Sequence, residues 1–481
     1  MVKDLPGFYF DTERNRYFPL SSRPSSSTSA TRSSTQRNSP ERKRFKIETE
    51  ANEPTVSRTI FHRTRTLPSS TTQRLFDCSL SSATRCNSLI THDARCSRFA
   101  STSRFDFSQT SCFGNITEFC SATTEDGLTR RYIGDDRGWF YTGVVYGEPS
   151  SDNHLQGSDQ YMPIDLPSAQ TYMWPPDINL HSHSEVSSIK VSGQTCVTTC
   201  FGPITKVAVQ DLRVSGRTTL ITFNKVHDVR GSHFQDGSLI LGAKNKAVYI
   251  PDINESGYTQ YLYNSQNSDI FALDRDENIV YTGARNGSIT RHDLRVPSEK
   301  HGHWLFQSRF SAQNNNRQPR QASSVSYLKL VKQSELIVSQ MNGELCTYDT
   351  RFPLQNSPSR QFRGHRNSVT SRLGICVDPA HDFLFAAGED YCIRGWSLRT
   401  GQALHAYDGN SASTAPVSTA MLNSSSTSSS LNRFRNPFKT LFPKAVSTLQ
   451  VTEESDGSLC LWAGCQQTLY RYFLGQYSKE P

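Results

Sequence analysis

The chain has 481 residues, a formal net charge of +8, and 10% aromatic residues. This length accommodates one large domain with tails, or two to three average domains. No apolar run reaches the roughly 18–20 residues that span a membrane, and the N-terminal residues lack the hydrophobic core of a secretory signal. The sequence therefore predicts a soluble protein of the nucleus or cytoplasm and excludes the membrane and secreted classes.

The excess of positive charge lies at the N-terminal end. Residues 1–110 hold 18 of the 52 Lys and Arg residues and 10 of the 44 Asp and Glu residues, which leaves 34 of each sign in the remainder. A neutral body argues against a domain built to bind nucleic acid. Weak contact through the basic tail is the one nucleic-acid interaction that this charge pattern supports.

Residues 1–20 form an aromatic segment that differs in composition from its C-terminal neighbour. Five aromatic residues fall within eleven positions: Phe8, Tyr9, Phe10, Tyr17 and Phe18. This density predicts a small aromatic hairpin or a docking peptide, which either packs on the main body or binds a partner. From residue 21 to 110 the sequence is rich in Ser, Thr, Arg and Pro without lasting periodicity, which predicts a disordered tail. The basic cluster Arg42–Lys46 is a candidate nuclear-localisation signal.

Residues 111–481 have the pattern of a repeat domain built from short strands. Val, Ile, Leu and aromatic runs alternate with Asn-Gly, Asp-Gly and Glu-Asp turns, which indicates antiparallel four-stranded sheets. The repeat is longer than the ~40–45 residues of a bare WD repeat because polar loop insertions occur at 300–322 and 408–444. The predicted fold is an all-β, seven-bladed WD-repeat β-propeller, with blade cores near 112–146, 186–213, 228–253, 269–295, 323–351, 367–399 and 445–473.

One repeat approaches the buried hydrogen-bond network of a typical WD repeat. His365, Asp390 and Trp396 match that network by spacing, but alanine (Ala386 or Ala387) occupies the Ser/Thr position. A partly satisfied buried network is costly. The alternatives are therefore a partial network or an Asp390 that faces solvent, and in either case the set is structural.

The ends of the predicted third strands carry the motif on which the functional hypothesis depends. Tyr348-Asp349-Thr350-Arg351 and His292-Asp293-Leu294-Arg295 are the best copies, Trp396-Ser397-Leu398-Arg399 has Ser in place of Asp, and Asp211-Leu212-Arg213 is a poorer copy. An Arg at a blade end can donate several hydrogen bonds to a partner, and the Asp can hold it in place. The alternative is a salt bridge used only within the blade.

These boxes resemble those of the substrate receptors of cullin-four RING ubiquitin ligases, which dock on the damaged-DNA-binding adaptor. The opening Leu5-Pro-Gly-Phe-Tyr-Phe-Asp-x-Glu-Arg-x-Arg-Tyr-Phe18 and the stretch Gly388-Glu-Asp-Tyr-Cys-Ile-Arg-Gly-Trp-Ser-Leu398 are similar to the associated factors of that family. In the family the opening motif precedes a disordered stretch and then a propeller. The resemblance implies a partner-binding set of Asp293, Arg295, Asp349, Arg351, Trp396 and Arg399. Residues 1–20 are the expected N-terminal docking motif.

Other kinds of site find little support in the sequence. The twelve cysteines are scattered, and only Cys196/Cys200 and Cys460/Cys465 come near the spacing of a zinc site. Both pairs lie in strand-like sequence, which favours free thiols in a β core. Phosphate-binding Gly loops, nucleophile elbows and His-Glu-x-x-His are absent from the sequence. We therefore expect no catalytic residues, no metal and no cofactor.

The favoured hypothesis is a non-catalytic substrate receptor of a cullin-four ligase. Its expected partners are the damaged-DNA-binding adaptor and a protein substrate that the sequence does not identify. The alternative is a WD-repeat scaffold of another nuclear assembly, for example in RNA processing, with the basic tail in contact with RNA.

Overall fold

The computed structural model describes residues 8–11, 16–19, 84–102, 105–124, 127–146, 171–214, 216–255, 258–264, 267–296, 302–307, 323–352, 358–405, 436–454 and 457–476. The chain divides into two units, Met1–Thr66 and Leu67–Pro481. In the first unit, β1 (Phe8–Asp11) pairs with β2 (Arg16–Pro19) in antiparallel register, with Tyr9 opposite Phe18. The hairpin predicted from the aromatic cluster is therefore confirmed. The side-chain contacts of its aromatic residues lie outside what the structure describes.

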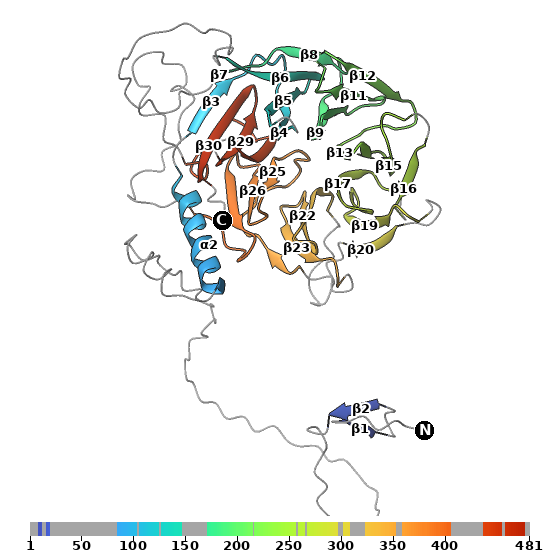
Figure 1. Ribbon diagram of the computed structural model, residues 1–481, viewed down its shortest axis with the longest axis vertical. Coiled ribbons are helices and arrows are strands. Elements are labelled where there is room, and N and C mark those ends of the chain that lie inside the picture. The colour runs from blue at the N-terminus through green and yellow to red at the C-terminus, as the bar shows by residue number, and fades with distance from the viewer. Residues whose placement is uncertain are drawn as a thin grey trace, which may run out of the picture. The chain divides into compact units, whose positions relative to one another are not determined.

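The described strands of the second unit form seven antiparallel sheets arranged as a ring, the predicted seven-bladed β-propeller (Figure 1). Blade 1 contains β4 (Ile116–Thr123), β5 (Thr129–Asp135), β6 (Trp139–Tyr146), β7 (Thr171–Met173) and β8 (Pro176–Asn179). Blade 2 contains β9 (Val186–Ser192), β10 (Thr195–Cys200), β11 (Thr205–Asp211) and β12 (Thr218–Phe223). Blade 3 contains β13 (Gly231–Gln235), β14 (Ser238–Gly242), β15 (Lys246–Ile250) and β16 (Gln260–Tyr263).

The remaining blades come in the same order along the chain. Blade 4 contains β17 (Ile270–Asp276), β18 (Ile279–Ala284), β19 (Ser288–Asp293) and β20 (His303–Gln307). Blade 5 contains β21 (Val325–Val331), β22 (Glu335–Gln340), β23 (Leu345–Asp349) and β24 (Arg360–Gln361). Blade 6 contains β25 (Ile375–Val377), β26 (Phe383–Ala387) and β27 (Ile393–Ser397). Blade 7 contains β28 (Thr448–Glu453), β29 (Ser458–Cys465), β30 (Thr468–Gln476) and β3 (Phe105–Gln109).

The second strand of each blade forms the deepest part of the core. Every residue of β14 and of β26 is buried, and five of the six residues of β10, β18 and β22 are. Such strands are covered on both faces by neighbouring blades, so small polar residues such as two of the three Thr of β10 are buried in them together with apolar ones. Eight of the cysteines are buried as free thiols within this core, as predicted: Cys112, Cys120, Cys196, Cys200, Cys346, Cys376, Cys460 and Cys465.

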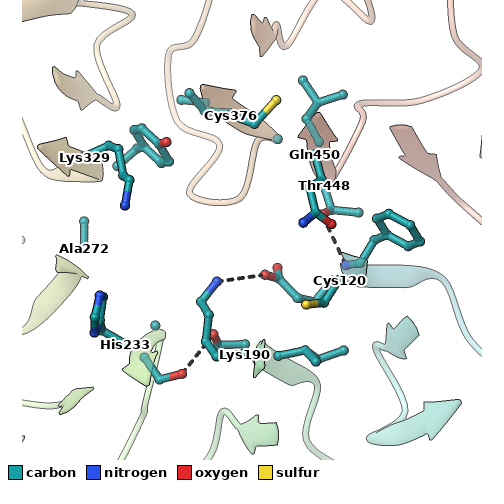
Figure 2. A pocket seen from close by; sticks show the side chains of 18 of the residues that line it. Cys120, Lys190, His233, Ala272, Lys329, Cys376, Thr448 and Gln450 are labelled. Carbon is teal, nitrogen blue, oxygen red and sulfur yellow. Dashed lines mark hydrogen bonds and ion pairs between the residues drawn. The ribbon is translucent and has the colours of Figure 1, made fainter. Parts of the chain in front are cut away.

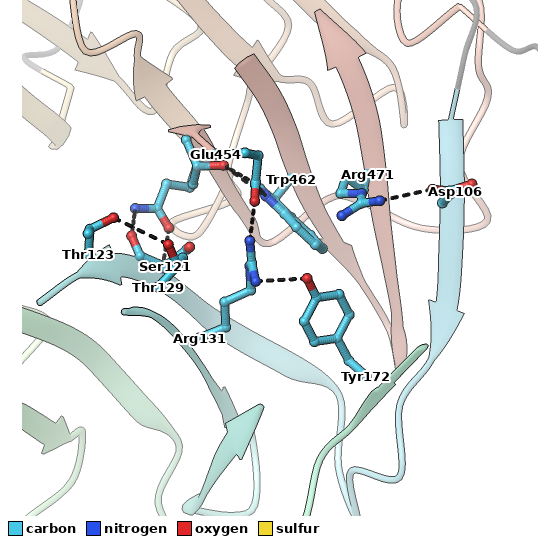
Figure 3. A network of polar contacts seen from close by, with 11 residues as sticks. Asp106, Ser121, Thr123, Thr129, Arg131, Tyr172, Glu454, Trp462 and Arg471 are labelled. Carbon is cyan, nitrogen blue, oxygen red and sulfur yellow. Dashed lines mark hydrogen bonds and ion pairs between the residues drawn. The ribbon is translucent and has the colours of Figure 1, made fainter. Parts of the chain in front are cut away.

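The ring is closed by a strand that precedes blade 1 in the sequence. β3 pairs antiparallel with β30 and becomes the outer strand of blade 7. Figure 3 shows the side chains beside this closure. Arg471 donates to Asp106 at 3.1 Å, and the buried Arg131 of blade 1 donates to the Tyr172 hydroxyl at 2.7 Å and to Glu454 of blade 7. The propeller therefore begins at Phe105, earlier than the predicted residue 111.

Helix α2 (Thr84–Ser101) packs against blades 6 and 7. Phe99 contacts Phe383 with ring centroids 4.5 Å apart, and Asn436 donates a hydrogen bond to the main-chain oxygen of Ala100 at 2.8 Å. The prediction of disorder for residues 21–110 is thus wrong for α2 and β3. Helix α2 was hidden because a polar sequence can still form a helix when two or three residues reach an existing core. Strand β3 was hidden because it pairs with a strand more than three hundred residues away.

The two predicted loop insertions are also partly ordered. β20 lies within 300–322 and supplies the outer strand of blade 4. Within 408–444, Phe438 and Phe442 pack on the core shared by blades 6 and 7. Apart from 302–307 and 436–444, both insertions lie outside the described residues.

Candidate protein-interaction site

The Asp-x-Arg sequences form the same turn at the end of the third strand in three blades. In blade 4 the main-chain nitrogen of Val296 donates to the carbonyl of Asp293 at 3.1 Å, and in blade 5 Phe352 donates to Asp349 at 3.2 Å. The Asp carboxylate also accepts the main-chain N–H two residues later, at 3.0 Å in both blades. Asp favours this position because its short side chain can close such a turn.

Each of these carboxylates also holds the Arg side chain through two further hydrogen bonds. Arg295 donates from Nε to Asp293 Oδ1 at 2.9 Å and from a terminal nitrogen to Oδ2 at 2.8 Å. Arg351 makes the same pair of bonds to Asp349, at 2.9 and 2.6 Å. Asp211 and Arg213 in blade 2 repeat the arrangement with longer bonds of 3.1 and 3.5 Å. The predicted pairing of Asp with Arg is thus present in all three copies.

The paired guanidinium groups remain accessible. The side chains of Arg295 and Arg351 are 69% and 67% exposed. Hydrogen bonds from the Arg side chain lower the pKa of Asp293 and of Asp349 to about 2, so both carboxylates stay charged. The guanidinium groups are therefore held in position without being covered.

An exposed apolar residue comes directly after the Arg in all three turns: Val214, Val296 and Phe352. The third strands of all blades run in the same direction through the ring, so the turns at their ends all lie on one face of it, which we call the Arg face. In each antiparallel blade the first strand ends on this same face. Blades 4 and 5 are neighbours through β17 and β21. The Arg face thus presents two adjacent arginines, each beside an apolar side chain.

The sixth blade differs from this pattern. Ser397 is buried and its hydroxyl lies 2.7 Å from Nε2 of His92 in helix α2, while His92 stacks on Phe383 at 5.3 Å. The helix therefore occupies the surface beside the third-strand end of blade 6. Arg399 is half-buried there. The Ser397 copy is thus part of the docking site of α2 and differs in surroundings from the other two predicted boxes.

Trp396, which the sequence placed in the partner-binding set, is 1% exposed. Its indole nitrogen donates to the main-chain oxygen of Arg363 at 3.0 Å. This burial removes Trp396 from the surface that a partner could touch, because the aromatic residue of the box faces the core while the Arg faces solvent. His292 and Tyr348 occupy the same strand position in blades 4 and 5.

The buried network of a typical WD repeat does not form around His365. The imidazole lies 3.2 Å from the Ala387 carbonyl and 3.4 Å from that of Gly343. Asp390 accepts two hydrogen bonds from Arg394 and lies 3.6 Å from Arg366. A main-chain oxygen thus takes the place of the missing Ser/Thr hydroxyl, and Asp390, whose side chain is partly exposed, pairs with arginines instead of His365.

The inner strands of the blades line a central channel of about 600 Å³, which the sequence did not reveal. Figure 2 shows Lys190, His233 and Lys329 directed into it from three blades. Lys190 lies 3.8 Å from Glu118, and Lys329 donates to Asp274 at 3.1 Å. Burial lowers the pKa of His233 to about 4 and raises that of Glu118. Lys190 and Lys329 are therefore each paired with a carboxylate of the channel wall.

Two further features that a functional site could use are a membrane-spanning helix and a metal-binding cluster. None of the helices that the structure describes is long and apolar enough to cross a membrane. No group of three or more His, Cys, Asp or Glu side chains within the described ranges could hold a metal ion.

Comparison with known proteins gives distant WD-repeat relatives. No protein-family model matches the chain. An uncharacterized WD repeat-containing protein of Caenorhabditis elegans is 29% identical over 132 residues, 27% of this chain and 21% of that protein. WD repeat-containing protein 21 of Schizosaccharomyces pombe is 28% identical over 150 residues, 30% of this chain and 32% of that protein. The matched region thus spans about a fifth and a third of these relatives.

Among solved structures, the WD40 β-propeller domain of Doa1 aligns with 79% of this chain and 98% of its own, at 13% identity and a TM-score of 0.49. The fold assignment itself comes from the seven sheets and their order. The chain is a seven-bladed β-propeller, and part of its sequence is similar to WD repeat-containing proteins.

Proposed function

We propose that the protein is a non-catalytic substrate receptor of a cullin-four RING ubiquitin ligase, and that it docks on the damaged-DNA-binding adaptor through Arg295 and Arg351. The observation that carries the proposal is the pair of exposed guanidinium groups on neighbouring blades, each held by its own aspartate. The resemblance of the boxes and of the opening aromatic motif to that receptor family supports the choice of partner. The N-terminal hairpin and Arg399 are further candidate contacts.

The arrangement suits binding more than internal stabilisation. An exposed ion pair contributes little to stability, since solvent screens it and the side chains lose entropy. A guanidinium that is already positioned loses less freedom when a partner's carboxylate or carbonyl group binds it. The apolar Val296 and Phe352 beside the two arginines add surface that a partner can cover.

The test is co-purification of the adaptor with the full chain after the double charge reversal Arg295→Glu and Arg351→Glu. We expect loss of the adaptor, because a reversed charge places like charges against the partner groups that the two guanidinium groups would bind. The matched control is Arg285→Glu. Arg285 lies in the turn between the second and third strands of blade 4, and its side chain is 68% exposed and pairs with Asp269. Undiminished co-purification of a folded double variant would remove the proposal.

A further inference from the structure

Two arginines lie at the mouth of the central channel on the face opposite to the Arg face, where each first strand begins. Arg372, just before β25 of blade 6, reaches across to blade 2. Its guanidinium donates to the main-chain oxygens of Val186 and Ser187 at 2.9 and 3.1 Å and lies 3.6 Å from Glu185. Arg372 is therefore fully engaged within the protein.

Arg230, just before β13 of blade 3, is held in a different way. Its guanidinium carbon lies over the ring of Phe201 at 4.7 Å and over the ring of Phe271 at 4.4 Å. Its side chain makes no hydrogen bond or ion pair with any residue in the part of the chain that the structure describes. Two aromatic contacts thus fix the cation and leave its N–H donors without an acceptor.

The charged groups around Arg230 are mostly committed elsewhere. Among the charged groups Glu185 acts on it most strongly, followed by Arg372 and then by Asp228, which makes no ion pair with it among the described residues. Glu185 pairs with Arg372, and the more distant Asp269 pairs with Arg285. Burial lowers the pKa of Arg230, yet an arginine remains charged at any physiological pH. The mouth therefore contains a positioned positive charge that has room for one further anion.

We propose that Arg230 anchors a recognition site for an acidic side chain of a protein ligand at this mouth of the channel. A guanidinium presents a planar set of donors that matches a carboxylate. The carboxylate of Glu185, already present at the mouth, disfavours a doubly charged group, so the site suits Asp or Glu better than a phosphate. The exposed Ile204 and Val369, each three residues from Phe201 or Arg372, provide apolar surface for the flanking residues of the ligand.

This site lies on the face opposite to the proposed adaptor contacts. Identification of the acidic ligand as a substrate of a ligase rests on the function proposed above, whereas the binding chemistry of Arg230 does not. Substrate and adaptor could then occupy the propeller together, which a receptor requires.

The test is selection of a phage-displayed random peptide library against the purified full chain, the Arg230→Met variant and the control Arg213→Met, whose side chain is 71% exposed on the Arg face. Met keeps an unbranched side chain that can lie between the two rings, so the variant retains most of the packing. We expect peptides selected on the wild type and on the control to share one Asp or Glu position. Selection on Arg230→Met should lose that position.

The best selected peptide is then measured with its shared carboxylate changed to the amide. On the wild type the change should weaken binding at least about tenfold, the loss of one charge-assisted hydrogen bond, and it should have little effect on Arg230→Met. If Arg230→Met does not fold, Arg230→Lys serves instead, and it should bind the acidic peptide more weakly than the wild type. No enriched peptide, no shared acidic position, or equal discrimination by the variant would overturn the inference.

Adaptor co-purification with the same variants separates the two proposals. Arg230→Met should leave the adaptor bound, and the Arg295/Arg351 double reversal should leave peptide binding intact. Peptide recognition by a chain that never retains the adaptor would preserve this site and remove the ligase function.

Discussion

We predict that Arg131 stabilises the contact between blades 1 and 7, and the variant Arg131→Met tests this prediction. Arg131 is 4% exposed, donates to Tyr172 and Glu454, and lies over the rings of Tyr172 and Trp462. Removing one partner of a buried ion pair costs about 3–5 kcal/mol, because the other charge stays buried. Glu454 is 14% exposed and Nε of Arg131 has no partner among the described residues, so we expect about 3 kcal/mol.

The assay is urea unfolding followed by tryptophan fluorescence, with Arg131→Met, Glu454→Gln and the double variant compared with the wild type. The double variant should be more stable than Arg131→Met, within about 1–2 kcal/mol of the wild type, since no unpaired charge remains. Gln retains an oxygen that can accept from Thr452 and Trp462 as Glu454 does. If the two single losses simply add, the side chains do not act as a pair and the reasoning is refuted.

Two further predictions concern buried side chains elsewhere. Phe99→Ala should destabilise the propeller by about 3–5 kcal/mol in the same urea assay, because Phe99 is buried against Phe383 and Phe385; an unchanged midpoint would show that α2 does not unfold with the ring. Burial lowers the pKa of His292 to about 4, below its ordinary 6.5. As the pH falls, the unfolded chain therefore binds the proton before the folded chain does. The free energy of unfolding should fall between about pH 6.5 and about pH 4, by roughly 3 kcal/mol for this residue. His292→Gln should reduce this acid loss, and an identical pH profile for the variant would contradict the assignment.

The blades could be predicted because their signals are local. Runs such as Ile279–Ala284, with Asn286-Gly287 two residues later and Asp293 at the end, specify two strands and their turns from nearby residues. The Asp-x-Arg turns were predictable for the same reason, since the carboxylate of Asp349 binds groups two residues away. Short sequence separation makes such contacts visible in the sequence.

The parts that the sequence missed depend on contacts between distant segments. His92 meets Ser397, and β3 meets β30, across more than three hundred residues. The isolation of Arg230 between Phe201 and Phe271 requires three blades to come together. The burial of Trp396 was not evident from the sequence, because the aromatic residue that faces the core and the Arg that faces solvent lie only three positions apart in the motif.

The closure of blade 7 constrains how the protein is made. Asp106 and Arg471, which face each other across the β3–β30 pair, are 365 residues apart. A ribosome therefore releases β3 long before its pairing strand exists, and the nascent chain carries an unsatisfied strand edge throughout synthesis of the six intervening blades. Ring completion is consequently a late, long-range event. Chains terminated before β30 would expose two open edges and become targets for chaperones and proteases.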